Sequence, residues 1–247
     1  MNVKEEIDLE RLRKLEPEEL LKEVFDRFGD RAAIGTSFQK TGTVIVDLTS
    51  RVVDDFRVYF IDTLRHPPET YKFIGQIEEK YDIDVEIYKP DEEELERLLE
   101  DQGQHGHLFS VQERKRCCQV RKTNPAQRVE KDLTATISGL RADQSSHREG
   151  NFRRVFWQPR EENQPLLKVN PLFKWTEEDL DDYIEEENLD THPLYDYRSE
   201  QGEVYKVIGC ETCHFPIQED RDKRAGKFPW EKSEKECGLH YTDGGGI

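Results

Sequence analysis

The residues with the most distinctive chemistry are five cysteines, which occur in three places. Cys117 and Cys118 are adjacent, Cys210 and Cys213 are separated by two residues, and Cys237 stands alone near the end of the chain. Two pairs supply four thiolates, which is the ligand number of a tetrahedral Zn²⁺ site or a [4Fe–4S] cluster. Buried core cysteines are the alternative, and the two pairs, one with CxxC spacing, argue against it.

The separation of the two pairs bears on the kind of metal centre. They lie 210 − 118 = 92 residues apart, much farther than in compact zinc ribbons, and zinc prefers two to four residues between paired cysteines. An iron–sulfur cluster is therefore our first interpretation and zinc our second. Either centre would join the helix near residue 117 to the C-terminal segment.

Composition and charge restrict the class of protein. The 247 residues suffice for one α/β domain with a short extension, and the formal net charge of −17 disfavours a general nucleic-acid binder. No stretch approaches the ~18 apolar residues of a membrane span, and the charged N-terminus lacks the apolar run of a signal peptide. We expect a cytoplasmic protein, whose cysteines bind metal or act in catalysis rather than form disulfides.

Hydrophobic spacing predicts strands that alternate with helices. The expected strands are 32–37, 56–62, 85–88, 135–139 and 166–170. The expected helices are 1–30, 43–48, 67–81, 91–101, 112–131 and 176–187, with 144–163 irregular. This alternation predicts an α/β fold whose mostly parallel sheet has helices on both faces. We expect an α/β unit over residues 1–190 with the first cysteine pair, and a C-terminal segment over 191–247 with the second pair and a mobile tail, within one structural domain.

Several short segments together resemble one family, the adenylyl-sulfate and phosphoadenylyl-sulfate reductases. The most specific are residues 116–122 (RCCQVRK), 209–213 (GCETC), 222–226 (DKRAG) and 236–240 (ECGLH). Further matches are 61–63 (IDT), 68–71 (PETY), 138–141 (SGLR) and 170–172 (NPL). They follow the family's order over about residues 32–240. Two departures are Leu64, where glycine is common, and Lys227-Phe228, where the family usually has Arg-Trp.

The resemblance implies a Rossmann-like, adenine nucleotide alpha hydrolase-like fold for residues 1–190, which would bind the nucleotide. It implies a [4Fe–4S] cluster on Cys117, Cys118, Cys210 and Cys213. Family members with both cysteine pairs generally use adenylyl sulfate, so we expect reduction of adenosine 5′-phosphosulfate to sulfite and AMP in assimilatory sulfate reduction. The nearest alternative is a cluster-containing reductase of the 3′-phosphorylated nucleotide. More distant alternatives are an ATP-dependent tRNA sulfurtransferase and a metal-binding interaction module.

The resemblance assigns the reactive thiol to Cys237. Reduction of sulfur requires a soft nucleophile, which a thiolate provides. Cys237 would attack the sulfate sulfur, release AMP and hold a thiosulfonate, from which thioredoxin would free sulfite. The sequence has no thioredoxin-like domain, so the reductant must be external. His240 follows three residues later and would either stabilise the thiolate, contact phosphate or remain solvated. A homo-oligomer is possible.

Sulfate and phosphate need cations and N–H donors. Our candidate cations are Lys122, Arg141, Arg224 and Lys227. Arg141 and Gly139 follow an expected strand, which is the usual place for a ligand contact in an open α/β sheet. The loop that begins with Ser37 and Phe38 joins a strand to a helix and could hold phosphate at the helix N-terminus. Asp62 and Thr63 end the second strand and would lie near the nucleotide or cap the strand.

Overall fold

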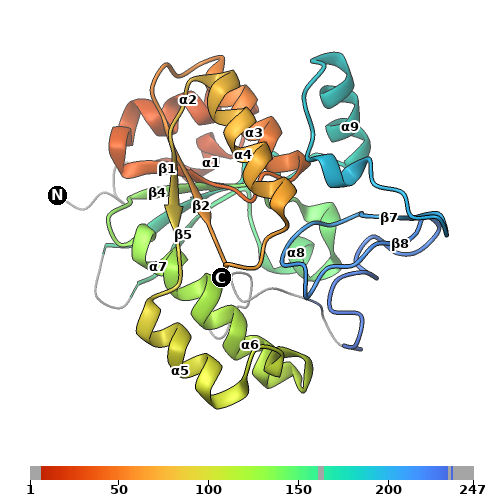
Figure 1. Cartoon of the computed structure of the whole chain (residues 1–247). Coiled ribbons are helices and arrows are strands. Elements are labelled where there is room, and N and C mark those ends of the chain that lie inside the picture. Colours follow the sequence, from red (N-terminus) through yellow and green to blue (C-terminus); the bar gives the residue numbers. More distant parts are fainter. Residues whose placement is uncertain (1–6, 161–163, 233–234, 236–247) are drawn as a thin grey trace.

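The computed structural model describes residues 7–160, 164–232 and 235, with the side chains of 146 and 147 excepted (Figure 1). Its strands are β1 (Ala32–Gly35), β2 (Arg57–Ile61), β3 (Val85–Tyr88), β4 (Ala135–Ser138), β5 (Val155–Gln158), β6 (Leu166–Val169), β7 (Glu203–Val204) and β8 (Ile217–Gln218). Its α-helices are α1 (Leu9–Leu12), α2 (Pro17–Phe28), α3 (Lys40–Ser50), α4 (Pro68–Tyr81), α5 (Glu92–Gln102), α6 (Val111–Cys118), α7 (Asn124–Glu130), α8 (Ser146–Asn151) and α9 (Glu177–Glu186).

Six strands form one sheet in the order β3-β2-β1-β4-β6-β5. Four of its five pairings are parallel, and only β5 runs antiparallel to its neighbour β6. The expected α/β fold with a mostly parallel sheet is confirmed. The chain moves outward from β1 to β3 and then returns to β4 on the other side of β1. A crevice at the carboxyl ends of β1 and β4 follows from this reversal.

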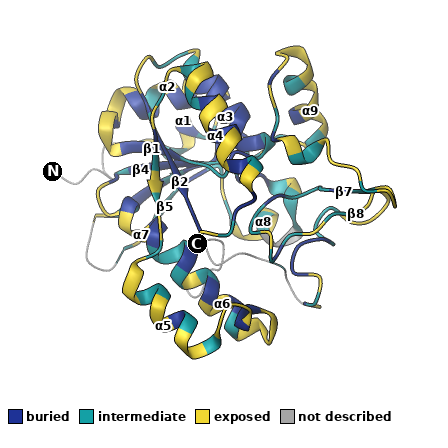
Figure 2. Cartoon of the chain, viewed as in Figure 1, coloured by how far each residue is buried: buried dark blue, intermediate teal, exposed yellow. Residues whose placement is uncertain are grey.

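Helices cover both faces of the sheet, as expected. Successive side chains of a strand point to opposite faces. Ala32 and Ile34 of β1 belong to a large core with residues of α2, α3, α4 and α9. Ala33 belongs instead to a smaller core that includes Ala126 and Val129 of α7. Figure 2 shows the central strands buried between these two layers, whereas the edge strand β3 is partly exposed.

The helix expected over 112–131 contains a π-helical turn. Residues Gln119–Thr123 form this turn between α6 and α7. Pro125 follows it, and a proline has no backbone N–H for the regular helical ladder. Such turns occur often at functional sites because the extra residue changes the direction of the side chains. Here Arg121 is buried, and Lys122 faces the cavity described below.

Other expected boundaries were partly wrong. The expectation that 144–163 is irregular is corrected by α8 and β5. Ser145 begins α8 by accepting a hydrogen bond from the Arg148 N–H, and β5 is a short edge strand with one fully buried position, so neither has strong hydrophobic periodicity. The helix expected over 1–30 breaks between α1 and α2, and α3 begins at Lys40 rather than 43.

After residue 191 regular structure is sparse, as the sequence predicts. Among the described residues of this segment, β7 and β8 form a two-stranded antiparallel ladder. The division into residues 1–190 and 191–247 stays a prediction. In the described part of the chain, every helix is too short or too polar to span a bilayer.

His192 connects this segment to the α/β unit through a fully buried imidazole. Its Nδ1 accepts a hydrogen bond from the Leu194 N–H at 3.2 Å. The proton of the neutral ring is therefore on Nε2, which lies 2.9 Å from the Thr70 hydroxyl. Burial lowers the pKa of His192 to about 4, and the carboxylate of Glu69 opposes this shift.

This pKa predicts a stability that decreases on acidification. The unfolded state binds a proton near pH 6.5 and the folded state only near pH 4, so stability is lost as pH falls through that window. Between pH 7 and pH 5, urea unfolding should show a loss of roughly 2 kcal/mol from this residue. His192→Gln should weaken the pH dependence, whereas His105→Gln, at an exposed position, should preserve it. Equal pH dependence in both variants would contradict the assignment.

Candidate active site

A cavity of about 460 Å³ lies at the carboxyl ends of β1, β2 and β4. Its walls come from the loops that follow these strands, from α6 and the π-helical turn, and from the C-terminal segment. The position agrees with the crevice that the strand order predicts. Lining residues that carry polar or ionisable groups include Ser37, Thr41, Thr63, Arg65, Lys122, Arg141, Glu177, Lys223, Arg224 and Lys227.

The first wall is the loop from β1 to the N-terminus of α3. Ser37 and residues 39–42 line the cavity, so the unpaired N–H groups of the first helical turn are available to an anion. A Cβ at Gly139 would lie 3.2 Å from the Thr41 side chain, so β4 approaches this turn closely. Phe38, in contrast, is fully buried and packs against Phe60 at a centroid distance of 6.2 Å.

The second wall follows β2 and contains the candidates Asp62 and Thr63, whose surroundings differ. Thr63 lines the cavity, whereas the Asp62 carboxylate accepts hydrogen bonds from the Leu64 N–H and the Tyr71 hydroxyl, each at 2.8 Å. Asp62 thereby holds a turn in which Leu64 has φ = +58°. Glycine adopts this conformation without strain, which explains why glycine is common there in the family.

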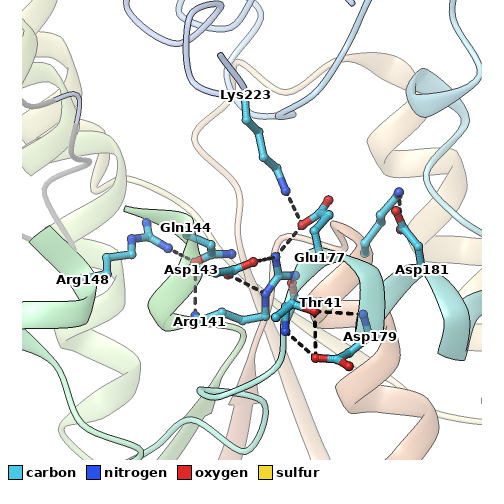
Figure 3. A network of polar contacts seen from close by, with 11 residues as sticks. Thr41, Arg141, Asp143, Gln144, Arg148, Glu177, Asp179, Asp181 and Lys223 are labelled. Atoms are coloured by element: carbon cyan, nitrogen blue, oxygen red, sulfur yellow. Dashed lines mark hydrogen bonds and ion pairs between the residues drawn. The ribbon is translucent and has the colours of Figure 1, made fainter. Parts of the chain in front are cut away.

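The third wall contains Arg141, whose side chain is almost fully buried in a network of polar contacts (Figure 3). Its guanidinium donates two hydrogen bonds to Asp143 at 3.0 Å each and one to the Thr41 hydroxyl at 3.1 Å. It also pairs with Glu177. Lys223 of the C-terminal segment donates to the same Glu177 carboxylate at 2.5 Å. The network therefore links four segments that are distant in sequence.

The charges in this network are fixed at neutral pH. Burial opposes ionisation of Glu177, but the hydrogen bonds and charges of Lys223 and Arg141 prevail and lower its pKa to about 2. Burial lowers the pKa of Lys223, and Glu177 counteracts that shift. The Glu177 carboxylate thus pairs with two cations beside the cavity, and Asp143 supplies the second negative charge. Sequence reasoning missed Glu177 because its position directly after a helix N-cap resembles an ordinary capping residue.

The remaining candidate cations come from two separate segments and meet at the cavity. Lys122 is on the π-helical turn, whereas Arg224 and Lys227 belong to the C-terminal segment, and all three line the cavity. Lys227 is buried, with its ammonium 5.3 Å from the Phe228 ring centroid. The structure therefore brings all four predicted cations to one cavity.

Four of the five cysteines line this cavity as free thiols, although 92 residues separate the two pairs. Cys117 and Cys213 are buried, and Cys118 and Cys210 are partly exposed. The Cys210 sulfur lies 3.2 Å from the Thr63 hydroxyl. Burial, and then the charges of Cys210 and Cys117, raise the pKa of the Cys213 thiol to about 12. A cationic partner would favour deprotonation of the Cys213 thiol.

Two arginines beside the thiols had not been singled out from the sequence. Arg65 lies 3.9 Å from the Cys117 sulfur and 3.0 Å from Nδ1 of His107. Arg121 donates to the Thr63 carbonyl at 2.9 Å, and among the described residues its buried Nε has no hydrogen-bond partner. Burial and the like charge of Arg65 lower the pKa of Arg121, and the Cys117 thiolate opposes that shift.

Cys237 and His240 lie outside the described residues, so the structure does not place them relative to the cavity.

Comparison with known proteins identifies the family. The model of the phosphoadenosine phosphosulfate reductase domain matches residues 31–216. The chain belongs to the phosphoadenosine phosphosulfate reductase family. This confirms the resemblance that the motifs indicate. The chain is 34% identical to adenosine 5′-phosphosulfate reductase from Staphylococcus epidermidis, over 91% of this chain and 87% of the relative. It is 36% identical to the enzyme of the same name from Bacillus pumilus, over 90% and 89% of the two chains.

Solved structures support the same fold. The phosphoadenylyl-sulfate reductase of Candida auris, in a phosphate complex, has a TM-score of 0.63 and 27% identity, and the match covers 83% of this chain and 96% of that one. The FMN adenylyltransferase of Candida glabrata has a TM-score of 0.55 at 14% identity, covering 83% and 65% of the two chains. The second likeness concerns the fold alone.

The geometry of Arg141 predicts a role in nucleotide binding. Arg141→Lys should weaken AMP binding about tenfold or more, because lysine cannot reproduce the two-pronged contact to Asp143 that holds this wall of the cavity, and a charge-assisted hydrogen bond contributes roughly 1.5–3 kcal/mol. Isothermal titration calorimetry with AMP measures the effect. Arg153→Lys, at an exposed position, is the matched control and should bind normally. Unchanged affinity in Arg141→Lys would refute the assignment.

Proposed function

We propose that this chain catalyses thioredoxin-dependent reduction of adenosine 5′-phosphosulfate to sulfite and AMP, in assimilatory sulfate reduction in the cytoplasm. The observation that carries the proposal is the gathering of two cysteine pairs and four candidate cations around one cavity at the carboxyl end of the sheet. The family match and the relatives named adenosine 5′-phosphosulfate reductase support the substrate and the reaction.

The cavity suits a nucleotide whose phosphate carries a sulfate. We assign the phosphate to the first turn of α3, where Ser37 and neighbouring N–H groups face the cavity. Lys122, Arg224 and Lys227 supply positive charge for the phosphosulfate. Arg141 is held in place by Asp143 and Glu177, so it is preorganised and need not be ordered when substrate binds.

In the reaction that we propose, the Cys237 thiolate attacks the sulfur of the substrate. A sulfur–sulfur bond forms as the bond from sulfur to the phosphate oxygen breaks, and AMP leaves with that electron pair. The cations around the cavity stabilise the charge that develops on the leaving phosphate. Thioredoxin then attacks the Cys237 sulfur, sulfite departs with the electron pair of the sulfur–sulfur bond, and the second thioredoxin thiol resolves the mixed disulfide. We leave His240 as a candidate to stabilise the thiolate.

The residues around the four thiols fit a [4Fe–4S] cluster. Among the described residues no three histidine, cysteine or acidic side chains are arranged to hold a single metal ion. Four cysteine thiols at one cavity match the donor set that a [4Fe–4S] cluster would need. The orphaned Nε of Arg121 is a buried donor that a cluster sulfide would satisfy.

We assign the cluster to Cys117, Cys118, Cys210 and Cys213. When bound, it would cross-link α6 to the C-terminal segment and place a compact charged group beside the cations of the substrate site. Thioredoxin as reductant, and a homo-oligomer, stay predictions.

The direct test of the proposed function is a steady-state assay of sulfite release with reduced thioredoxin. We expect kcat/KM for adenosine 5′-phosphosulfate to exceed that for the 3′-phosphorylated nucleotide. The opposite preference would favour the alternative of a cluster-containing phosphoadenylyl-sulfate reductase. Absence of sulfite from both nucleotides would contradict the proposal.

Replacement of the reactive thiol separates catalysis from cluster binding. Cys237→Ser should abolish turnover, because a hydroxyl is a poor nucleophile toward sulfur, and should leave the iron content and visible spectrum unchanged. Sulfite formation by this variant at the wild-type rate would exclude Cys237 as the nucleophile.

Replacement of a proposed cluster ligand, unlike replacement of Cys237, should affect the cluster itself. Cys210→Ser should lose the absorbance of the cluster and most of its iron, because a serine hydroxyl does not replace the thiolate. Ser199→Ala, in the same C-terminal segment and away from the thiols, is the control and should keep both. Full iron content in Cys210→Ser would refute the ligand assignment.

A further inference from the structure

A buried ion pair connects α6 to the C-terminal segment just before the residues that lead to Cys237. Arg114 of α6 donates from Nε and Nη2 to the two carboxylate oxygens of Glu231, each at 2.8 Å. The side chains are 0% and 1% exposed. Arg114 is one of the largest fully buried side chains among the described residues.

Aromatic packing joins this ion pair to the second cysteine pair. The Arg114 guanidinium lies over the Phe228 ring, 4.3 Å from its centroid. The Phe228 N–H donates to the Cys213 carbonyl at 2.9 Å, and its ring lies 5.8 Å from the ring of His214. Arg114 thus contacts Glu231 directly and is linked through Phe228 to the segment that carries Cys213.

A buried ion pair of this kind adds little to the stability of a protein, but it defines the relative position of the two segments that it joins. Two charges removed from water lose hydration, and an apolar pair of similar volume often stabilises a protein as well or better. A planar, two-pronged contact, however, permits only one relative orientation of its partners. Stacking on Phe228 restricts the guanidinium further. The pair therefore defines where Glu231 lies relative to α6.

The position of Glu231 limits where the reactive thiol can go. Cys237 follows by 237 − 231 = 6 residues, and six extended residues reach at most about 20 Å. Arg114 precedes Cys117 by three residues on the same helix and therefore lies on the same face as that cysteine. Glu231, six residues before Cys237, is consequently held beside the cavity by its contact with Arg114.

We propose that Arg114 and Glu231 are positioning residues for the attack by Cys237: their buried pair anchors the C-terminal segment to α6 so that the thiol can reach the substrate sulfur. This inference rests on the proposed function. It assigns to the pair a role in the first chemical step, because Arg114 occupies both carboxylate oxygens of Glu231 and the pair lies between α6 and the segment that leads to Cys237.

The test is a single-turnover reaction of the anaerobically purified holoenzyme with adenosine 5′-phosphosulfate in the absence of thioredoxin. AMP release and the mass increase of the Cys237 peptide report formation of the thiosulfonate. Glu231→Gln removes one charge with little change in shape. We expect this rate to fall about 10- to 100-fold, since small misplacements of a reacting group have effects of that size. AMP affinity and iron content should stay within twofold of wild type.

A second variant distinguishes positioning from simple stability. Arg114→Met/Glu231→Leu replaces the pair by apolar side chains and should restore the thermal midpoint toward wild type, because no unpaired charge is left buried. Its single-turnover rate should nevertheless stay low, because the defined orientation is lost. Glu219→Gln is the matched control in the same segment, since it removes only an exposed pair with Arg198, and should react at the wild-type rate.

The outcomes separate this inference from the proposed function. If the wild-type enzyme forms no thiosulfonate, the proposed function fails and the positioning role fails with it. If the wild-type enzyme reacts and both anchor variants react equally fast, only the positioning role is overturned. The single-turnover rate could also fall in Glu231→Gln and return to the wild-type value in the double variant together with the thermal midpoint. That result would overturn the positioning role as well, because the pair would then act through folding alone.

Discussion

The proposed active site depends on one constraint: two cysteine pairs that are 92 residues apart in the sequence must lie at the same cavity. The first pair is at the end of α6, and the second is in a segment with little regular structure of its own. Several contacts join this segment to the rest of the molecule, among them the buried His192 with Thr70. Two ion pairs, Arg114 with Glu231 and Lys223 with Glu177, join it to α6 and α9.

The same segment completes the substrate site. The strand order creates a crevice between the ends of β1 and β4, as in other open α/β sheets. The α/β unit alone supplies only part of the walls of this crevice. Arg224 and Lys227 reach it from the C-terminal segment. The proposed reactive thiol, two of the four proposed cluster ligands and half of the candidate cations therefore belong to one stretch of chain, which explains how a general nucleotide-binding fold can be adapted to reduce sulfur.

Much of this was predictable from the sequence, and the misses have physical causes. The strong hydrophobic periodicity of β1, β2 and α4 predicted the sheet, and ordered motifs predicted the family. The short edge strand β5 was missed because it has one fully buried position. The π-helical turn was missed because its hydrophobic pattern differs little from that of an α-helix. Arg114, Glu177 and Glu231 were missed because sequence does not show which charged side chains meet after folding. Phe38 packs in the core, and the Asp62 carboxylate caps the turn after β2, which was one of its two expected roles. A role of either residue at the nucleotide stays a prediction.

The central claim is that the four thiolates bind one iron–sulfur cluster. The most direct measurement is the iron and acid-labile sulfide content of anaerobically purified wild-type protein, together with its visible spectrum. We expect about four iron and four sulfide per chain, with broad absorption near 400 nm. One zinc per chain and no sulfide would contradict the claim, because the same thiols would then serve a different centre.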